Sequence, residues 1–124
     1  MEKVENYLVT LGISYESIGE KTWLVNDEEK GLGQVVIMTA DPVVVIRVKV
    51  MSIPSSDREE FYKTLLELNG TDLVHGSYGI DGDDIVIVDT LEYLTMDLEE
   101  FQASLDAIGL ALAQHYKILS KYKD

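Results

Sequence analysis

The acidic residues around Gly82 form a stretch that could act as a metal-binding loop. Calcium loops of the EF-hand type carry oxygen ligands at alternate positions, a glycine at the sixth position and a glutamate at the twelfth. Counted from Asp81, the sixth residue is Val86, and the residues beside it are apolar, as in a buried strand. Because Asp-Gly pairs are typical of hairpin turns, we interpret residues 81–84 as a turn and predict no metal site.

Glycine and histidine residues show no pattern typical of catalysis. Gly31 and Gly33 precede a predicted strand, whereas a phosphate-binding glycine loop follows a strand and opens a helix. His75 and His115 lie far apart in the sequence, and we expect His115 to be a half-buried helix residue with one hydrogen-bond partner. Cysteine is absent, which excludes disulfides, thiolate zinc sites and cysteine nucleophiles. We therefore predict a protein that is not an enzyme and binds no cofactor.

Basic residues are scarce, and two of them lie on the most apolar predicted strand. The chain holds 10 lysines and arginines against 23 aspartates and glutamates. Arg47, Lys49 and Met51 alternate along residues 43–52 and so share one face, while we expect the opposite, apolar face in the core. Such charges either protect an exposed sheet surface or edge, or form a partly apolar, partly basic surface for a partner segment.

Two aromatic residues could extend such a surface. Trp23 lies in a predicted strand and Tyr62 in a predicted helix, although a tryptophan at such a position is more typical of the core. The candidate partner-binding residues are therefore Arg47, Lys49, Met51, Trp23 and Tyr62.

The overall composition narrows the class of protein. With a formal net charge of -13, the chain lacks the excess of lysine and arginine that binding to nucleic acid or anionic lipid requires. Hydrophobic residues make up 46%, which is typical of a globular protein rather than a disordered one. The sequence shows no membrane span and no targeting signal at its start. We expect a cytoplasmic protein with a single domain over residues 1–124.

The spacing of apolar residues predicts the elements that position these side chains. In chain order we predict a helix over residues 1–11, strands over 22–25, 34–39 and 43–52, a helix over 57–69, strands over 76–80 and 85–90, and a helix over 97–122. A short extended segment could also start at Tyr15. The order α-β-β-β-α-β-β-α favours an antiparallel sheet with helices, which is an α+β fold.

One glycine is unusual for its place in the last predicted helix. Gly109 costs about 1 kcal/mol relative to alanine inside a helix. Ala103, Ala107 and Ala111 form a row of small residues nearby. Small residues allow another backbone to approach closely, so we expect close packing against this helix.

Taken in order, short motifs along the chain resemble the YbjN family, which has the type III secretion chaperone-like fold. The motifs are GLGQVVI at 31–37, DPVVV at 41–45, FYKTLLELN at 61–69, GSYGI at 76–80, IVIV at 85–88 and LEEF at 98–101. The likeness covers nearly the whole chain, and its motifs are structural rather than catalytic. It implies a small, acidic, homodimeric protein of regulatory or chaperone-like function that holds an unfolded segment of a partner. It implies no catalytic residues.

Two alternative functions follow for this chain. The first is a non-enzymatic chaperone-like or regulatory protein that holds a peptide or protein partner. The second is a regulatory domain that senses a small ligand in a pocket between sheet and helices. We also expect a homodimer, because the last helix and the mixed strand face carry more apolar surface than a small monomer covers. Its interface would be the middle helix or the exposed sheet face.

Overall fold

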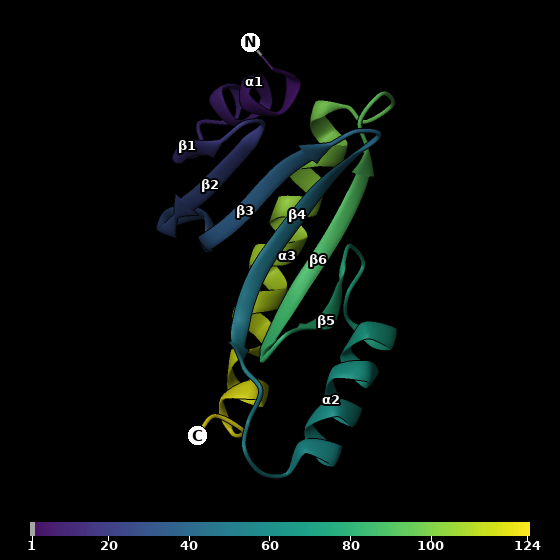
Figure 1. Cartoon of the computed structure of the whole chain (residues 1–124). Helices are drawn as coiled ribbons and strands as arrows, with labels where there is room; N and C mark the ends of the chain where they lie inside the picture. The colour runs from purple at the N-terminus through teal and green to yellow at the C-terminus, as the bar shows by residue number, and fades with distance from the viewer. Residues whose placement is uncertain (1) are drawn as a thin grey trace.

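The computed structural model describes residues 2–124, and Figure 1 shows the course of the chain. The helices are α1 (Lys3–Thr10), α2 (Arg58–Thr71) and α3 (Leu98–Ser120), and a short 3₁₀ helix is η1 (Glu28–Lys30). The strands are β1 (Tyr15–Gly19), β2 (Thr22–Asp27), β3 (Leu32–Ala40), β4 (Val43–Ser52), β5 (Ser77–Asp81) and β6 (Asp84–Glu92). None of the described helices is both long enough and apolar enough to cross a membrane.

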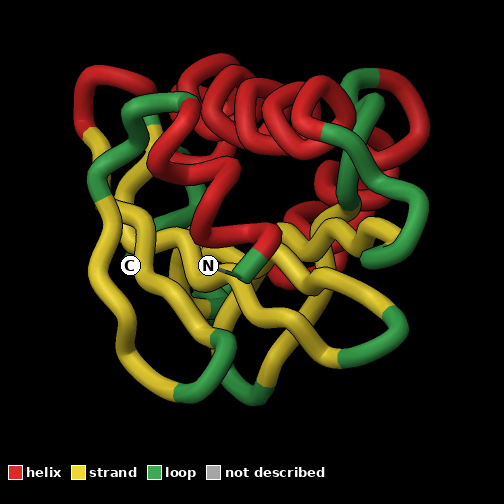
Figure 2. The backbone as a smooth tube through the Cα atoms, turned by 90° about the horizontal axis from the view of Figure 1, so that it is seen from above, coloured by secondary structure: helices red, strands yellow, loops and turns green. Residues whose placement is uncertain are grey.

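The six strands form one antiparallel sheet in the order β1-β2-β3-β4-β6-β5. The helices lie on one face of this sheet, and the opposite face carries none (Figure 2). The predicted α+β fold is therefore confirmed. The extended segment expected at Tyr15 is a complete edge strand, because it pairs with β2 from Tyr15 opposite Val25 onward. Residues 81–84 form the predicted hairpin turn between β5 and β6.

The core lies between the inner face of the sheet and the helices. Val44, Ile46 and Val48 of β4 are buried on this inner face, as their alternation predicts. Helix α3 begins after Asp97, whose carboxylate accepts a hydrogen bond from the amide of Glu100. The buried side chains of α3 recur mostly at spacings of three and four, as in an amphipathic helix: Phe101, Ser104, Leu105, Ile108, Ala111, His115 and Leu119.

A loop packs closely against α3 at Gly109. A β-carbon added to Gly109 would lie 3.0 Å from the carbonyl oxygen of Lys30, at the end of η1, so any larger residue there would force a shift. Close packing therefore accounts for this glycine, as predicted. The alanine row takes little part in the contact, because Ala103 is exposed and Ala107 only half-buried.

Candidate functional site

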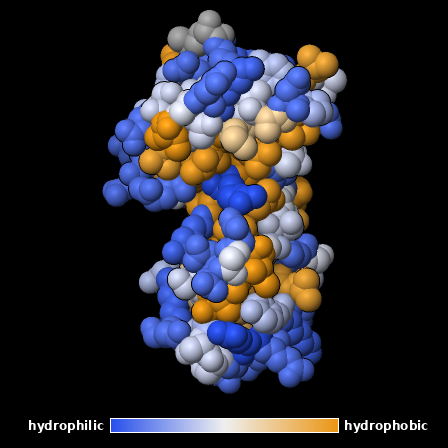
Figure 3. Space-filling view, in the orientation of Figure 1, coloured by the Kyte–Doolittle hydropathy of each residue, from blue (hydrophilic) through white to orange (hydrophobic). Residues whose placement is uncertain are grey.

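The sheet face without helices carries partly exposed apolar side chains around Arg47. Residues directly opposite each other in an antiparallel sheet point to the same side, so the strand register identifies the members of this band. Two rows of cross-strand neighbours make up what we call the outer sheet surface: Leu24, Val36, Arg47 and Val88 in the first row, Met38 and Val45 in the second. Figure 3 views this face and shows hydrophobic side chains gathered over its middle.

A shallow hollow of about 270 Å³ lies within the outer sheet surface, lined by Val36, Met38, Val45 and Arg47. Met38 is 41% exposed, and the two valines are half-buried. Strands lie about 4.8 Å apart, so the first row spans roughly 14 Å across four strands, which is the length of about four extended residues. The outer sheet surface therefore matches a short extended peptide in size.

Arg47 and Lys49 both point to this outer face, as predicted, and both form ion pairs with the β5–β6 hairpin. Nη1 of Arg47 lies 2.8 Å from Oδ2 of Asp81, and Nζ of Lys49 lies 3.4 Å from Oδ1 of Asp84. All four side chains are well exposed, so each pair contributes at most about 1 kcal/mol to stability. The main effect of the two aspartates is to balance the positive charge beside the apolar hollow.

Two of the predicted partner-binding residues lie in the core instead. Trp23 is 4% exposed, on the face of β2 that packs against the helices. Met51 is 6% exposed, because the register of β4 against β6 shifts between Lys49 and Met51. This bulge moves Met51 from the face of Arg47 to the inner face. The expectation that both residues lie on a binding surface is therefore corrected by their burial.

Tyr62 lies at a separate place, in a groove between α2 and the edge strand β5. We call this the edge groove, and its volume is about 260 Å³. Leu66 and Ile80, which also line it, are 69% and 59% exposed. The side chain of Asn69 closes one part of the strand edge: it accepts a hydrogen bond from the amide of Tyr78 and donates one to the Tyr78 carbonyl. The structure therefore places Tyr62 on the helix side of the sheet, away from Arg47.

A buried hydrogen-bond network that sequence reasoning missed links three elements beside the edge groove. Nδ1 of His115 lies 2.7 Å from the hydroxyl of Tyr78, and Nε2 lies 3.1 Å from Oδ2 of Asp72. His115 is 1% exposed, so it is fully buried with two partners rather than half-buried with one. Its place in the apolar stripe of α3 signals burial, but the two partners come from segments whose placement depends on tertiary structure.

The proton positions in this network follow from the chemistry of its partners. In the tautomer that carries its proton on Nε2, His115 donates to the Asp72 carboxylate, which can only accept, and Nδ1 accepts from the Tyr78 hydroxyl. Burial, together with the charge of Asp72, raises the pKa of Tyr78 well above its ordinary value. The phenol therefore stays protonated and is a poor nucleophile, which favours a structural role for the network.

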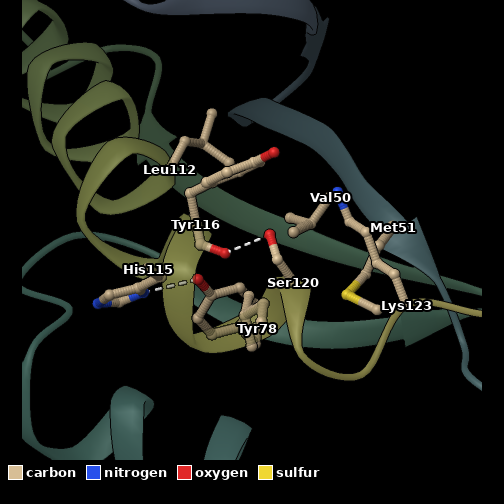
Figure 4. Close-up of a pocket in the computed structure, with 9 residues that line it drawn as sticks. Val50, Met51, Tyr78, Leu112, His115, Tyr116, Ser120 and Lys123 are labelled. Carbon is tan, nitrogen blue, oxygen red and sulfur yellow. Dashed lines mark hydrogen bonds between the residues drawn. The ribbon is translucent and has the colours of Figure 1, made fainter.

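A small cavity of about 160 Å³ lies between the end of α3 and strand β4 (Figure 4). Two of its polar side chains make hydrogen bonds within the protein. The Tyr78 hydroxyl points to His115, and the Ser120 hydroxyl donates to the carbonyl of Tyr116 at 2.6 Å. Its other walls are largely apolar. Within residues 2–124, no three histidine, cysteine, aspartate or glutamate side chains gather in a way that could hold a metal ion.

Comparison with known proteins identifies the family of this chain. The model of the CesT_Tir_1 family matches residues 1–124. The chain belongs to the CesT_Tir_1 family. No curated protein matches this sequence.

Solved structures of similar shape confirm the fold expected from the sequence motifs. A chain of the heterodimeric ExoU–SpcU complex from the type III secretion system of Pseudomonas aeruginosa has a TM-score of 0.73 and 15% identity, and the match covers 90% of this chain and 93% of that chain. YbjN from E. coli has a TM-score of 0.66 and 14% identity, and the match covers 92% of this chain and 89% of that chain. A chain of the HopA1–SchA chaperone–effector complex has a TM-score of 0.63 and 6% identity, and the match covers 88% of this chain and 86% of that chain. At such identities the likeness establishes a shared fold.

Proposed function

We propose that this member of the CesT_Tir_1 family is a non-enzymatic, chaperone-like binding protein that holds an extended segment of a partner protein on its outer sheet surface. One observation carries the proposal: a six-stranded sheet presents a face with no helix on it, and partly exposed apolar side chains line a hollow there. Full burial of an exposed large apolar side chain contributes about 1.5–3 kcal/mol, and these partly exposed side chains contribute a part of that when a partner covers them. Two structures of similar fold support the proposal, because each of them contains a complex of two proteins: one is a heterodimeric complex and the other a chaperone–effector complex.

The partner is a protein rather than a nucleic acid, because the net charge of -13 repels phosphate. We place this activity in the cytoplasm. A small-ligand sensor is the alternative function, and the cavity beside Tyr78 would be its site. That cavity holds about 160 Å³, whereas pockets for small ligands usually hold about 300–1,000 Å³. The size of the cavity therefore favours the protein partner.

We further propose that the chain forms a homodimer through the edge groove. Tyr62, Leu66 and Ile80 gather apolar surface at the free edge of β5, and α2 carries two of these three residues. Exposed apolar surface at a sheet edge promotes association with other chains unless it is covered. A dimer through α2 would cover it and leave the outer sheet surface open for the partner.

Substitution of Met38 tests the proposed function. The probe is fluorescently labelled α-lactalbumin that has been reduced and carboxymethylated, so that it stays unfolded. Met38→Glu places a charge in the hollow and should weaken binding at least about tenfold, because an apolar segment that covers the carboxylate strips its hydration and loses the apolar contact of Met38. Fluorescence anisotropy gives the dissociation constant.

A control variant shows whether binding depends on where the new charge lies or only on the added charge. Leu94 is 83% exposed in the loop before α3, and it does not line the hollow of the outer sheet surface. Leu94→Glu adds the same charge and should change the dissociation constant less than about twofold. Equal dissociation constants for the wild type and Met38→Glu would show that the outer sheet surface is not the binding site.

A further inference from the structure

The side chain of Arg47 has more hydrogen-bond donors than the protein uses. A guanidinium carries five N–H groups in a planar fork. Within residues 2–124, its hydrogen bond is the one from Nη1 to Oδ2 of Asp81, at 2.8 Å. The guanidinium therefore keeps unused donors beside the hollow formed with Val36, Met38 and Val45.

The charge of Arg47 is already balanced, and this decides what those donors can bind. Asp81 neutralises Arg47, and Asp84 neutralises Lys49 two residues along the same strand face. The protein as a whole carries a net charge of -13. A partner carboxylate would compete with Asp81 and would be repelled by the whole molecule. A neutral acceptor neither competes with Asp81 for the charge of Arg47 nor is repelled by the net charge of the protein.

The main chain of an extended segment supplies neutral acceptors at the right spacing. Successive residues of a strand rise about 3.3 Å and expose carbonyl oxygens to both sides. In the first row of the outer sheet surface, Val36 and Val88 are the cross-strand neighbours of Arg47. A segment that places apolar side chains against these valines brings its backbone over the guanidinium. Hydrogen bonds there are strengthened because apolar groups displace water around them.

We infer that Arg47 binds main-chain carbonyl oxygens of the partner, and that the occupant of the outer sheet surface is an extended apolar segment free of acidic residues. Backbone recognition by Arg47 would make binding tolerant of sequence, while the hollow selects apolar side chains. This inference rests on the proposed function and adds to it the chemistry of the partner.

Three ten-residue peptides test the inference by fluorescence anisotropy. Each alternates leucine with serine, lysine or glutamate, so that they are neutral, basic or acidic. The neutral and basic peptides should bind, and the acidic peptide should bind at least about tenfold more weakly. Tightest binding of the acidic peptide would overturn the inference, because it would assign a carboxylate to Arg47.

Variants of Arg47 then distinguish hydrogen bonding from charge. For the neutral peptide, Arg47→Ala removes every donor and should weaken binding about tenfold. Arg47→Lys keeps the charge and three donors but loses the planar fork, and it should weaken binding about threefold. Arg47→Gln keeps neutral donors and should lose only about threefold. Lys49→Gln is the matched control, since it removes one charge from the same strand face, and it should change the affinity less than about twofold.

Salt provides an independent readout. The loss caused by Arg47→Lys should persist from about 50 mM to about 500 mM salt, because a charge-balanced hydrogen bond is only weakly screened. Full binding by Arg47→Lys, or a loss that vanishes at high salt, would contradict the inference. If Arg47→Ala bound each peptide as tightly as the wild type does, the inference about Arg47 would be wrong, while the proposed function would stand. Failure of every peptide to bind the wild type would remove the proposed function as well.

Discussion

At the scale of single residues, buried polar groups in this protein are placed by partners that lie far away in the sequence. Tyr78, His115 and Asp72 come from β5, α3 and the end of α2, and they meet in one hydrogen-bond network. A buried histidine with an unused ring nitrogen would cost about 1–3 kcal/mol. The network therefore fixes the end of α2 and strand β5 against α3.

Removal of the Tyr78 hydroxyl should change both the stability and its dependence on pH. Tyr78→Phe leaves Nδ1 of His115 without a donor and should lower the free energy of unfolding by about 1–3 kcal/mol at pH 7. The pKa of Tyr78 is raised from 10.0 in the folded protein, mainly by burial. Its contribution is therefore complete below pH 10 and is lost as the pH rises from 10 toward the folded pKa, because the unfolded chain ionises first.

Urea unfolding at a series of pH values measures this effect. The wild-type free energy of unfolding should fall above pH 10, and Tyr78→Phe should fall less steeply. Tyr116→Phe is the control, because Tyr116 is 63% exposed, and it should follow the wild-type curve. Parallel curves for the wild type and Tyr78→Phe would show that the folded protein does not hold this phenol protonated.

At the scale of elements, periodicity predicts most of this fold and local irregularity accounts for the errors. The alternation in β4 correctly places Val44, Ile46 and Val48 in the core. It misplaces Met51, because a bulge depends on the pairing of β4 with β6 and leaves no signal in a single sequence. Likewise, Arg47 on the outer face follows from the period of two, whereas its ion pair with Asp81 depends on the neighbouring hairpin.

The proposed dimer is a property of α2 and β5. Leu66→Glu places a charge in the edge groove, and Leu66 is too exposed for this change to disturb the core. We expect light scattering to give the mass of two chains for the wild type and of one chain for Leu66→Glu, because a buried unpaired charge opposes association. Leu110→Glu, on the exposed side of α3, should remain a dimer. A wild-type mass of one chain at micromolar concentration would contradict the proposal.

At the scale of the whole molecule, the sheet separates two apolar regions. The edge groove, between α2 and β5, lies on the helix side, and the outer sheet surface lies on the opposite side. A segment bound to the outer face therefore need not compete with a dimer partner at the edge. The strong negative charge keeps such a protein soluble despite its exposed apolar residues and repels acidic partners.

The most direct test of the account is to locate the bound peptide by NMR. The alternating leucine–serine peptide is added to the isotopically labelled protein, and the backbone amide shifts are followed during titration. The account predicts that the largest shifts lie in β2, β3, β4 and β6 around Val36, Arg47 and Val45, with small changes at Leu66 and Leu112. Largest shifts at the edge groove or at the cavity beside Tyr78, with the outer sheet surface unchanged, would contradict it.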